Sequence, residues 1–452
     1  MTFTSRSMRR RRLVRHISTI VVTTAGALVA ALFAVGVAAT GTPSEEGRVL
    51  IERLGCPVCH DVPGHATTIR KEAPDLTWEG DRVRPDWLFA FLKSPGTIRP
   101  ALGARMPNFR LTDEEALALT EALGALRDRA AKPLPAAQRY KGTVTAAARD
   151  AAQKLTTKDY FDCFSCHWDG DRKPAGKQEE WGPDLGRVPQ RLEPDWIVRW
   201  LTDPAKIAPG TKMPGFFADD KSGPDDILDG NEMAQMMALR DWLASRGKRD
   251  ADPAYGRAKA EHPDAGVSVG RSLLVRLNCV GCHRIGGFPE GRRVGPHLGF
   301  QGSRVTRTWL AEFLRKPAAI KPEYAIMGSD ARMPDFRLTD REVAVLTDYV
   351  MTKLVDRSVP DVAPGTFDPK LAPEGERLFA GKFCDNCHRI GERPGGIGPE
   401  LTYAGRRLNP AWIYRFVLNP SHFLDTRMPN LKLTETEARA VTSYLVHRDR
   451  TP

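Results

Sequence analysis

The pattern of apolar and polar positions predicts one long apolar segment followed by four similar groups of short helices. Residues 17–39 carry no charged side chain and are mostly apolar, and this length is sufficient for one helix to cross a bilayer. Further along the chain, segments with helical spacing of apolar residues alternate with loops rich in Gly and Pro. The pattern therefore predicts an all-α protein with an N-terminal signal or anchor helix and repeated helical domains.

A basic stretch precedes the apolar segment. Six arginines lie within the first 15 residues, and Val37-Ala38-Ala39 supplies small residues for a cleavage site. Two interpretations stay open: residues 1–40 are a signal peptide that is cleaved near Ala39, or residues 17–39 remain in the membrane as an anchor. Both interpretations predict that the rest of the chain lies outside the cytoplasm, on the periplasmic side.

Four copies of one order of features follow residue 43. Each copy has a short helical segment, a pair of cysteines, a proline-containing turn, a helix with a tryptophan, a Met-Pro pair and a final helix. The first cysteines of the pairs are 107, 116 and 105 residues apart. Such a period indicates repeated domains. We call them repeats 1 to 4 and expect them at residues 43–132, 146–246, 266–356 and 371–452, joined by polar linkers.

The start of each final helix is marked by a capping residue. Three repeats have a Thr-x-x-Glu capping box, which begins at Thr112, Thr339 and Thr434. Repeat 2 has an insertion at this point and offers Asp229-x-x-Glu232 instead.

The net charge adds little to this picture. The chain has 67 Lys and Arg against 56 Asp and Glu, a formal net charge of +11. Six of the surplus charges lie in the first 15 residues, so that 11 − 6 = 5 remain, without a long basic stripe. A nucleic-acid-binding surface is therefore not expected.

All eight cysteines belong to four Cys-x-x-Cys-His motifs, one in each repeat. This motif is the attachment signature of c-type haem, in which two thiols bind one porphyrin and the adjacent histidine binds its iron. Disulfides or thioredoxin-like redox pairs would leave the four histidines unexplained. The motifs predict four haem c groups on Cys56 and Cys59, Cys163 and Cys166, Cys279 and Cys282, and Cys384 and Cys387, with His60, His167, His283 and His388 as iron ligands.

Each repeat also has one methionine followed by proline, 46, 46, 50 and 40 residues after its histidine. A thioether is a suitable sixth ligand for haem iron and raises its reduction potential. We expect Met106, Met213, Met333 and Met428 to bind the four irons. These residues could instead be loop or core methionines, and Met327 and His422 are rival ligands that lie six residues before the chosen ones.

Together these motifs resemble tandem class I cytochrome c domains over about residues 43–452. The resemblance implies four domains, each of a few helices around one haem. It implies that a proline carbonyl accepts a hydrogen bond from each haem histidine, a role that falls on Pro74, Pro183, Pro296 and Pro399. It also implies that a glycine of the first helix packs against an aromatic residue of the last helix. Repeat 1 has Ala122 at that place, so we expect a looser contact there.

An electron carrier without catalytic activity is the leading functional interpretation. If each of the four haem irons has six ligands, no position remains for a substrate. The protein would then pass single electrons between a donor and an acceptor protein of a respiratory chain. Two alternatives stay open. One is a peroxidase-like haem enzyme in which one iron, for which repeat 3 is the candidate, loses its methionine. The other is a fixed cytochrome c subunit of a membrane respiratory complex.

A basic residue directly precedes each of the four methionines: Arg105, Lys212, Arg332 and Arg427. Positive charge near a haem edge can steer an acidic partner protein. We expect Arg105 and Arg427 to act in this way, with solvated loop charges as the alternative.

Overall fold

The computed structural model describes residues 43–65, 73–98, 105–217, 223–247, 251–291, 295–318, 332–359, 366–394, 398–422 and 428–448. The predicted signal or anchor over residues 1–40 lies outside these ranges. The packing of the chain separates Met1–Glu46 from Gly47–Pro452, and the fold described below is that of the second part. Across the described ranges, no helix combines the length and the apolar character that a membrane span requires.

Repeat 2 builds its core from its own residues. Its elements are α7 (Ala146–Leu155), α8 (Cys163–Cys166), η3 (Gln178–Glu180), η4 (Leu185–Arg187), α9 (Val188–Arg191), α10 (Pro194–Thr202), α11 (Pro204–Ile207), η5 (Leu228–Gly230) and α12 (Glu232–Ser245). Helices α7 and α10 both pack against α12. Leu155, Ile197 and Leu239 are buried together in this core.

Repeat 4 folds in the same way and adds a small hairpin. Its elements are η6 (Pro369–Leu371), α19 (Ala372–Gly381), η7 (Cys384–Asn386), β1 (Arg389–Ile390), β2 (Arg393–Pro394), α20 (Ala404–Arg407), α21 (Pro410–Leu418), η8 (Pro420–His422) and α22 (Glu435–His447). Strands β1 and β2 pair antiparallel. Helix α19 packs closely on α22 because Gly375 lacks a side chain: a Cβ there would lie 2.0 Å from the Ala440 carbonyl oxygen.

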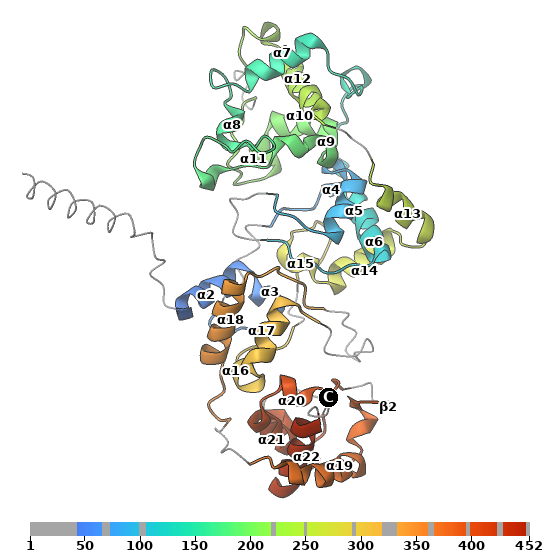
Figure 1. The fold of residues 1–452 in the computed structure, drawn as a ribbon. Coiled ribbons are helices and arrows are strands. Elements are labelled where there is room, and N and C mark those ends of the chain that lie inside the picture. Colours follow the sequence, from blue (N-terminus) through green and yellow to red (C-terminus); the bar gives the residue numbers. More distant parts are fainter. Residues whose placement is uncertain are drawn as a thin grey trace, which may run out of the picture. The chain divides into compact units, whose positions relative to one another are not determined.

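Repeats 1 and 3 exchange their first halves. Repeat 1 supplies α2 (Pro43–Arg53), α3 (Cys56–Cys59), α4 (Glu79–Arg82), α5 (Pro85–Lys93) and α6 (Asp113–Gly124), and η2 (Ala136–Gln138) lies in the following linker. Repeat 3 supplies α14 (Val267–Arg276), α15 (Cys279–Cys282), α16 (Gln301–Arg304), α17 (Arg307–Arg315) and α18 (Asp340–Lys353), and α13 (Pro253–Glu261) precedes it. The first helix of repeat 3, α14, packs on the last helix of repeat 1, α6. The first helix of repeat 1 contacts the last helix of repeat 3 through Gly47 and Tyr349, as can be followed in Figure 1.

Two modules result from this exchange. Module A combines residues 47–62 with residues 295–354, and module B combines residues 74–124 with residues 253–288. The core of module B joins Leu88 and Leu117 of repeat 1 to Leu274 of repeat 3. The sequence ranges 43–132 and 266–356 thus each contribute to two cores.

The exchange also changes the partners of the helix-packing glycines. Gly47 faces Tyr349, and a Cβ at Gly47 would lie 2.4 Å from the Cβ of that tyrosine. Gly270 faces α6, where a Cβ would lie 1.8 Å from the Ala118 carbonyl oxygen and 2.7 Å from the Ala122 side chain. The expectation of a looser contact at Ala122 is therefore wrong, because the small alanine allows the backbones of α6 and α14 to approach closely.

The capping residues follow the sequence pattern with one exception. The capping boxes of α6, α18 and α22 are formed by Thr112, Thr339 and Thr434 with the glutamates three residues later. In repeat 2, by contrast, Asn231 caps α12 by accepting a hydrogen bond from the Ala234 backbone N–H. Asp229 has φ of 56°, a left-handed conformation that ends the preceding turn, so it is not the cap of α12.

Candidate haem sites

Each Cys-x-x-Cys-His motif forms one tight turn that follows a left-handed residue. The preceding residues Gly55, Asp162, Asn278 and Phe383 have φ between 46° and 72°. In every motif the histidine backbone N–H donates a 2.9 Å hydrogen bond to the carbonyl of the first cysteine. The turn therefore holds both thiols and the imidazole close together, as attachment to a single porphyrin requires.

A proline carbonyl orients each motif histidine. The Nδ1 atoms of His167 and His388 lie 2.8 Å from the carbonyl oxygens of Pro183 and Pro399 in their own repeats. The Nδ1 atoms of His60 and His283 lie 3.0 Å from the carbonyl oxygens of Pro296 and Pro74, each from the other repeat. A carbonyl only accepts, so Nδ1 carries the proton and Nε2 keeps its lone pair for a metal ion.

Burial keeps these side chains in the forms that a haem site needs. Desolvation is the main cause that lowers the pKa of His60, His167, His283 and His388, which favours the neutral, iron-binding imidazole. Desolvation also raises the pKa of Cys56, Cys163 and Cys279 to about 12 and that of Cys384 to about 11. All eight cysteines of the four motifs are partly buried.

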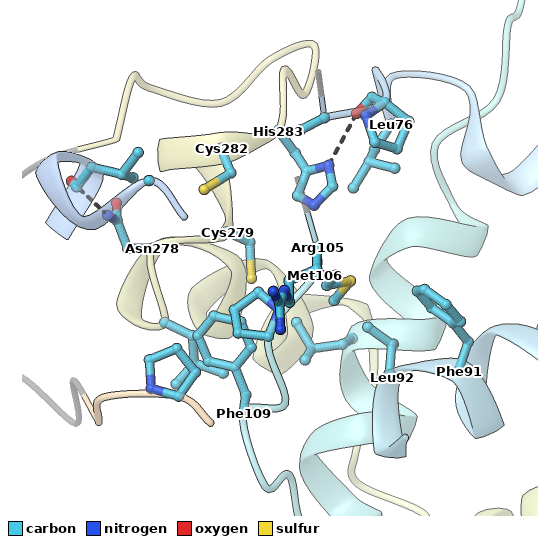
Figure 2. Close-up of a pocket in the computed structure, with 18 of the residues that line it drawn as sticks. Leu76, Phe91, Leu92, Arg105, Met106, Phe109, Asn278, Cys279, Cys282 and His283 are labelled. Carbon is cyan, nitrogen blue, oxygen red and sulfur yellow. Dashed lines mark hydrogen bonds between the residues drawn. The ribbon is translucent and has the colours of Figure 1, made fainter. Parts of the chain in front are cut away.

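Modules A and B share a cavity of about 290 Å³. Its lining includes His60 and His283 with their cysteines, and Met106 and Met333 from the two Met-Pro loops. In Figure 2 the imidazole of His283 and the sulfur of Met106 face the same space. The histidines and methionines predicted as iron ligands in repeats 1 and 3 therefore line one cavity.

The other two methionines lie within their own repeats. Met213 packs against the core of repeat 2, where its sulfur lies 2.8 Å from the Trp200 Nε1 donor. Met428 packs against the core that includes the helices of repeat 4. Of the rival ligands, His422 is half exposed and its Nε2 lies 3.2 Å from the Ser358 hydroxyl, and Met327 falls outside the described residues.

Four arginines form a repeated feature that the sequence analysis missed. Each lies five residues before the tryptophan of its repeat: Arg82, Arg191, Arg304 and Arg407. The Nε atoms of Arg82, Arg304 and Arg407 are buried without a hydrogen-bond partner in the described part of the protein. Buried donors of this kind suit an anionic group such as a haem propionate. The spacing Arg-x₄-Trp in all four repeats is the signal that could have identified them.

These arginines lie where neighbouring repeats touch. The backbone at Val83 forms an antiparallel bridge with Leu192, and the backbone at Val305 forms the same bridge with Leu408. Across these junctions the guanidinium of Arg191 lies over the Trp87 ring at 5.2 Å, and that of Arg304 lies over the Trp412 ring at 5.1 Å. Module B therefore contacts repeat 2, and module A contacts repeat 4, through equivalent segments.

Three of the four basic residues that precede the methionines form contacts within the described part of the protein. Arg105 forms a salt bridge with Glu342, and Arg332 forms one with Glu115. The Lys212 amino group donates a 2.7 Å hydrogen bond to the Glu179 carbonyl. The Arg105 guanidinium thus connects repeat 1 to repeat 3, and its expected role in steering a partner stays a prediction. Arg427 lies outside the described residues.

Two regions of the chain match known protein families. Residues 267–353 match the cytochrome c family, and residues 370–445 match the family of subunit III of cbb3-type cytochrome c oxidase. The first region runs from α14 to α18, so it begins in module B and ends in module A. No curated protein and no solved structure matches the chain. The neutral histidines, paired thiols and buried cationic donors fit haem. The chain thus carries cytochrome c-type domains, which bind haem c covalently and transfer electrons through it.

Proposed function

We propose that the protein is a tetrahaem c-type cytochrome that passes single electrons between redox proteins of a respiratory chain. The observation that carries this proposal is the fourfold motif, in which each histidine Nδ1 is hydrogen-bonded to a proline carbonyl. The same arrangement in all four repeats supports four equivalent haem c sites rather than two. When bound, each haem supplies one-electron redox chemistry, and the protein supplies the ligands and the buried surroundings.

Methionine as sixth ligand at all four irons is part of this proposal. Met106, Met213, Met333 and Met428 are all partly buried, and each packs against a core or lines the cavity described above. His/Met ligation raises the reduction potential of haem iron. With both axial positions filled by side chains, the protein would act as a carrier and not as an enzyme.

The donor and acceptor are proposed to belong to a membrane respiratory complex on the periplasmic side. The likeness of residues 370–445 to a cbb3-type oxidase subunit supports an oxidase as the partner or as the complex that contains this chain. Residues 17–39 would anchor the protein in the membrane, or the protein would be released after cleavage near Ala39. Purification from membranes in detergent, with or without oxidase subunits, distinguishes these arrangements.

The number of haems is the direct test of the proposal. A pyridine haemochrome assay of the mature protein should give four haems per chain. Cys387→Ser should reduce the covalent attachment of one haem to a single thioether or abolish it, whereas Asp385→Ser, inside the same motif, should leave four. Three haems or fewer in the unmutated mature protein would contradict the proposal.

A haem enzyme is the competing function, and carbon monoxide separates it from a carrier. An iron that has lost its methionine has an open position and binds carbon monoxide when reduced. The carrier should show no change in its visible spectrum under carbon monoxide. Stoichiometric binding at one haem would favour the enzyme.

A further inference from the structure

We propose that repeats 1 and 3 complete each other's haem sites. The haem on Cys56, Cys59 and His60 would take Met333 as its sixth ligand, and the haem on Cys279, Cys282 and His283 would take Met106. The inference rests on the proposed function insofar as every motif binds haem. It goes further by assigning ligands across repeats that are separated by the whole of repeat 2.

On the histidine side, the proposed sites already combine residues of repeats 1 and 3. In repeat 2, Gly182 donates a backbone hydrogen bond to the Cys166 carbonyl at 2.7 Å, and in repeat 4 Gly398 does the same to Cys387. The equivalent bond to the Cys59 carbonyl comes from Gly295, again at 2.7 Å. The turns that support His60, His167 and His388 therefore share this bond, and for His60 the donor comes from repeat 3.

A second backbone hydrogen bond also comes from the same repeat in repeats 2 and 4 and from the other repeat in modules A and B. The residue after each motif histidine accepts a hydrogen bond from the leucine two residues beyond the supporting proline. Trp168 and Arg389 accept it from leucines of their own repeats, at 2.9 Å in both. Asp61 accepts it from Leu298 of repeat 3 at 2.8 Å, and Arg284 accepts it from Leu76 of repeat 1 at 2.9 Å.

The methionine side follows the same division of the cores. Met106 and Phe109 pack against the buried cluster of module B, and Cys279 packs against that same cluster. Cys56 packs instead against a separate cluster formed by module A and repeat 4, together with Phe336 and Leu338 of the second Met-Pro loop. Met106 therefore shares its apolar surroundings with Cys279, and Figure 2 shows its sulfur facing the cavity opposite His283.

The two Met-Pro loops hold each other in place. Asn108 and Asp335 form a pair of antiparallel backbone hydrogen bonds of 2.7 and 2.8 Å. Arg337 donates to the Met106 carbonyl at 3.0 Å, and Arg110 donates to the Met333 carbonyl at 3.0 Å. The backbone of each methionine is thus held by an arginine of the other loop.

The two attachment turns are also in direct contact. The Asn278 side-chain amide lies 3.4 Å from the Val58 carbonyl and 3.5 Å from the Cys59 sulfur. Gly281 packs against Val58 so closely that a Cβ at Gly281 would lie 2.5 Å from the valine side chain. Haems held by the two crossed sites would therefore be neighbours, and electrons would pass directly between repeats 1 and 3.

The ligand assignment can be tested by nuclear magnetic resonance of the reduced full chain with labelled methionine methyl groups. The ring current of a porphyrin shifts the methyl signal of an iron-bound methionine far upfield, and Met106→Leu and Met333→Leu identify the two signals. In Cys279→Ser/Cys282→Ser, the Met106 signal should return to its normal position. Return of the Met333 signal alone would overturn the proposal. In the control Cys384→Ser/Cys387→Ser, only Met428 should move.

A second experiment keeps every ligand and so does not depend on folding of the cysteine variants. A specific protease site inserted at residues 248–250 allows the mature protein to be cut between repeats 2 and 3. Crossed sites predict that both fragments co-elute in 1 M salt, retain all four methionine signals and separate only in denaturant. Separation into two fragments with unchanged His/Met spectra would overturn the inference.

Failure of the proposed tetrahaem function would give a different result from failure of the crossed ligand assignment. If a motif binds no haem, the haemochrome count before the cut falls below four, whatever the fragments do. The matched control is a cut at residues 360–365, which should leave His388 and Met428 bound to one haem in the C-terminal fragment, since Gly398, Pro399 and Leu401 of repeat 4 supply the bonds that support the His388 turn.

Discussion

The carboxylate of Glu342 caps α18 and also forms a salt bridge with Arg105, which precedes it by 237 residues. Arg105 further donates to the carbonyl oxygens of Phe336 and Arg337 at 3.3 and 3.1 Å. Glu115 of repeat 1 forms the corresponding salt bridge with Arg332 of repeat 3. A charge that sequence position suggested for partner docking is therefore part of the contact between two repeats.

The first prediction is that Arg105→Glu destabilises the fold. The new carboxylate would face Glu342 and leave two carbonyl oxygens without their donor, so the free energy of unfolding should fall by about 1–3 kcal/mol. Arg53→Gln is the matched control, because Arg53 contacts the same carboxylate at 3.4 Å but is 45% exposed, and should cost less than about 1 kcal/mol. Denaturation followed by haem absorbance measures both. Unchanged stability with slower electron transfer to a partner at low salt would restore the docking role.

The second prediction concerns acid stability. Burial alone raises the pKa of Glu342, but hydrogen bonds from the Thr339 backbone and from Arg105, with the charge of Arg105, outweigh it and lower that pKa below its ordinary value of 4.5. A carboxyl with a lowered pKa stabilises the fold fully above the unfolded value, and this contribution is lost as the pH falls through the folded value.

Glu342→Gln should therefore reduce stability at pH 7 and flatten the loss of stability below about pH 5. Thermal midpoints measured from pH 7 to pH 3 give the comparison. Glu114→Gln serves as the control, because Glu114 is an exposed residue in the first turn of α6. Parallel pH profiles for the parent and Glu342→Gln would refute the link.

The third prediction concerns the buried arginines. Burial lowers the pKa of Arg304, and burial together with the charge of Arg304 lowers the pKa of Arg407 to about 10. If these cations face haem propionates, removing one stabilises oxidised iron. Arg407→Leu should then lower one reduction potential by about 30–60 mV, equivalent to about 0.7–1.4 kcal/mol. Potentiometric titration should show a much smaller effect for the exposed neighbour, Arg406→Leu; equal effects would show that burial of the charge is irrelevant.

The fourth prediction is that Gly270→Ala disrupts module B. A methyl group would meet the Ala118 carbonyl oxygen at 1.8 Å, and a backbone atom between two packed helices has little room to move. The loss in unfolding free energy should be about 3 kcal/mol. Gly256→Ala, in α13, meets nothing within 4 Å and should instead stabilise by up to about 1 kcal/mol. A tolerated alanine at 270 would indicate that α14 does not pack on α6.

The local features of the sites could be predicted from sequence because short spacings determine them. The capping boxes at Thr112, Thr339 and Thr434 form as their spacing requires. Repeat 2 shows the limit of such reasoning. There Asp229 and Asn231 are both acceptable caps by residue type, and the left-handed backbone at Asp229 decides between them.

The exchange between repeats 1 and 3 could not be predicted, because similar repeats offer similar partners. Pro74 and Pro296 stand in the same local pattern, so spacing alone pairs each with the nearest histidine in the chain. The pairing depends instead on long-range contacts, such as those of Gly47 with Tyr349 and of Asn278 with Val58. No local pattern in the sequence encodes such contacts.

The hydrogen bond between His60 and Pro296 has a consequence for biosynthesis, since 236 residues separate the two. At about 5–20 residues per second, the ribosome needs roughly 12–47 s to reach the proline after it has made the histidine. The equivalent wait for His167 and Pro183, 16 residues apart, is about 1–3 s. The first Cys-x-x-Cys-His motif to be made thus waits longest for the carbonyl that orients its histidine, and this wait continues while repeat 2 is already able to fold.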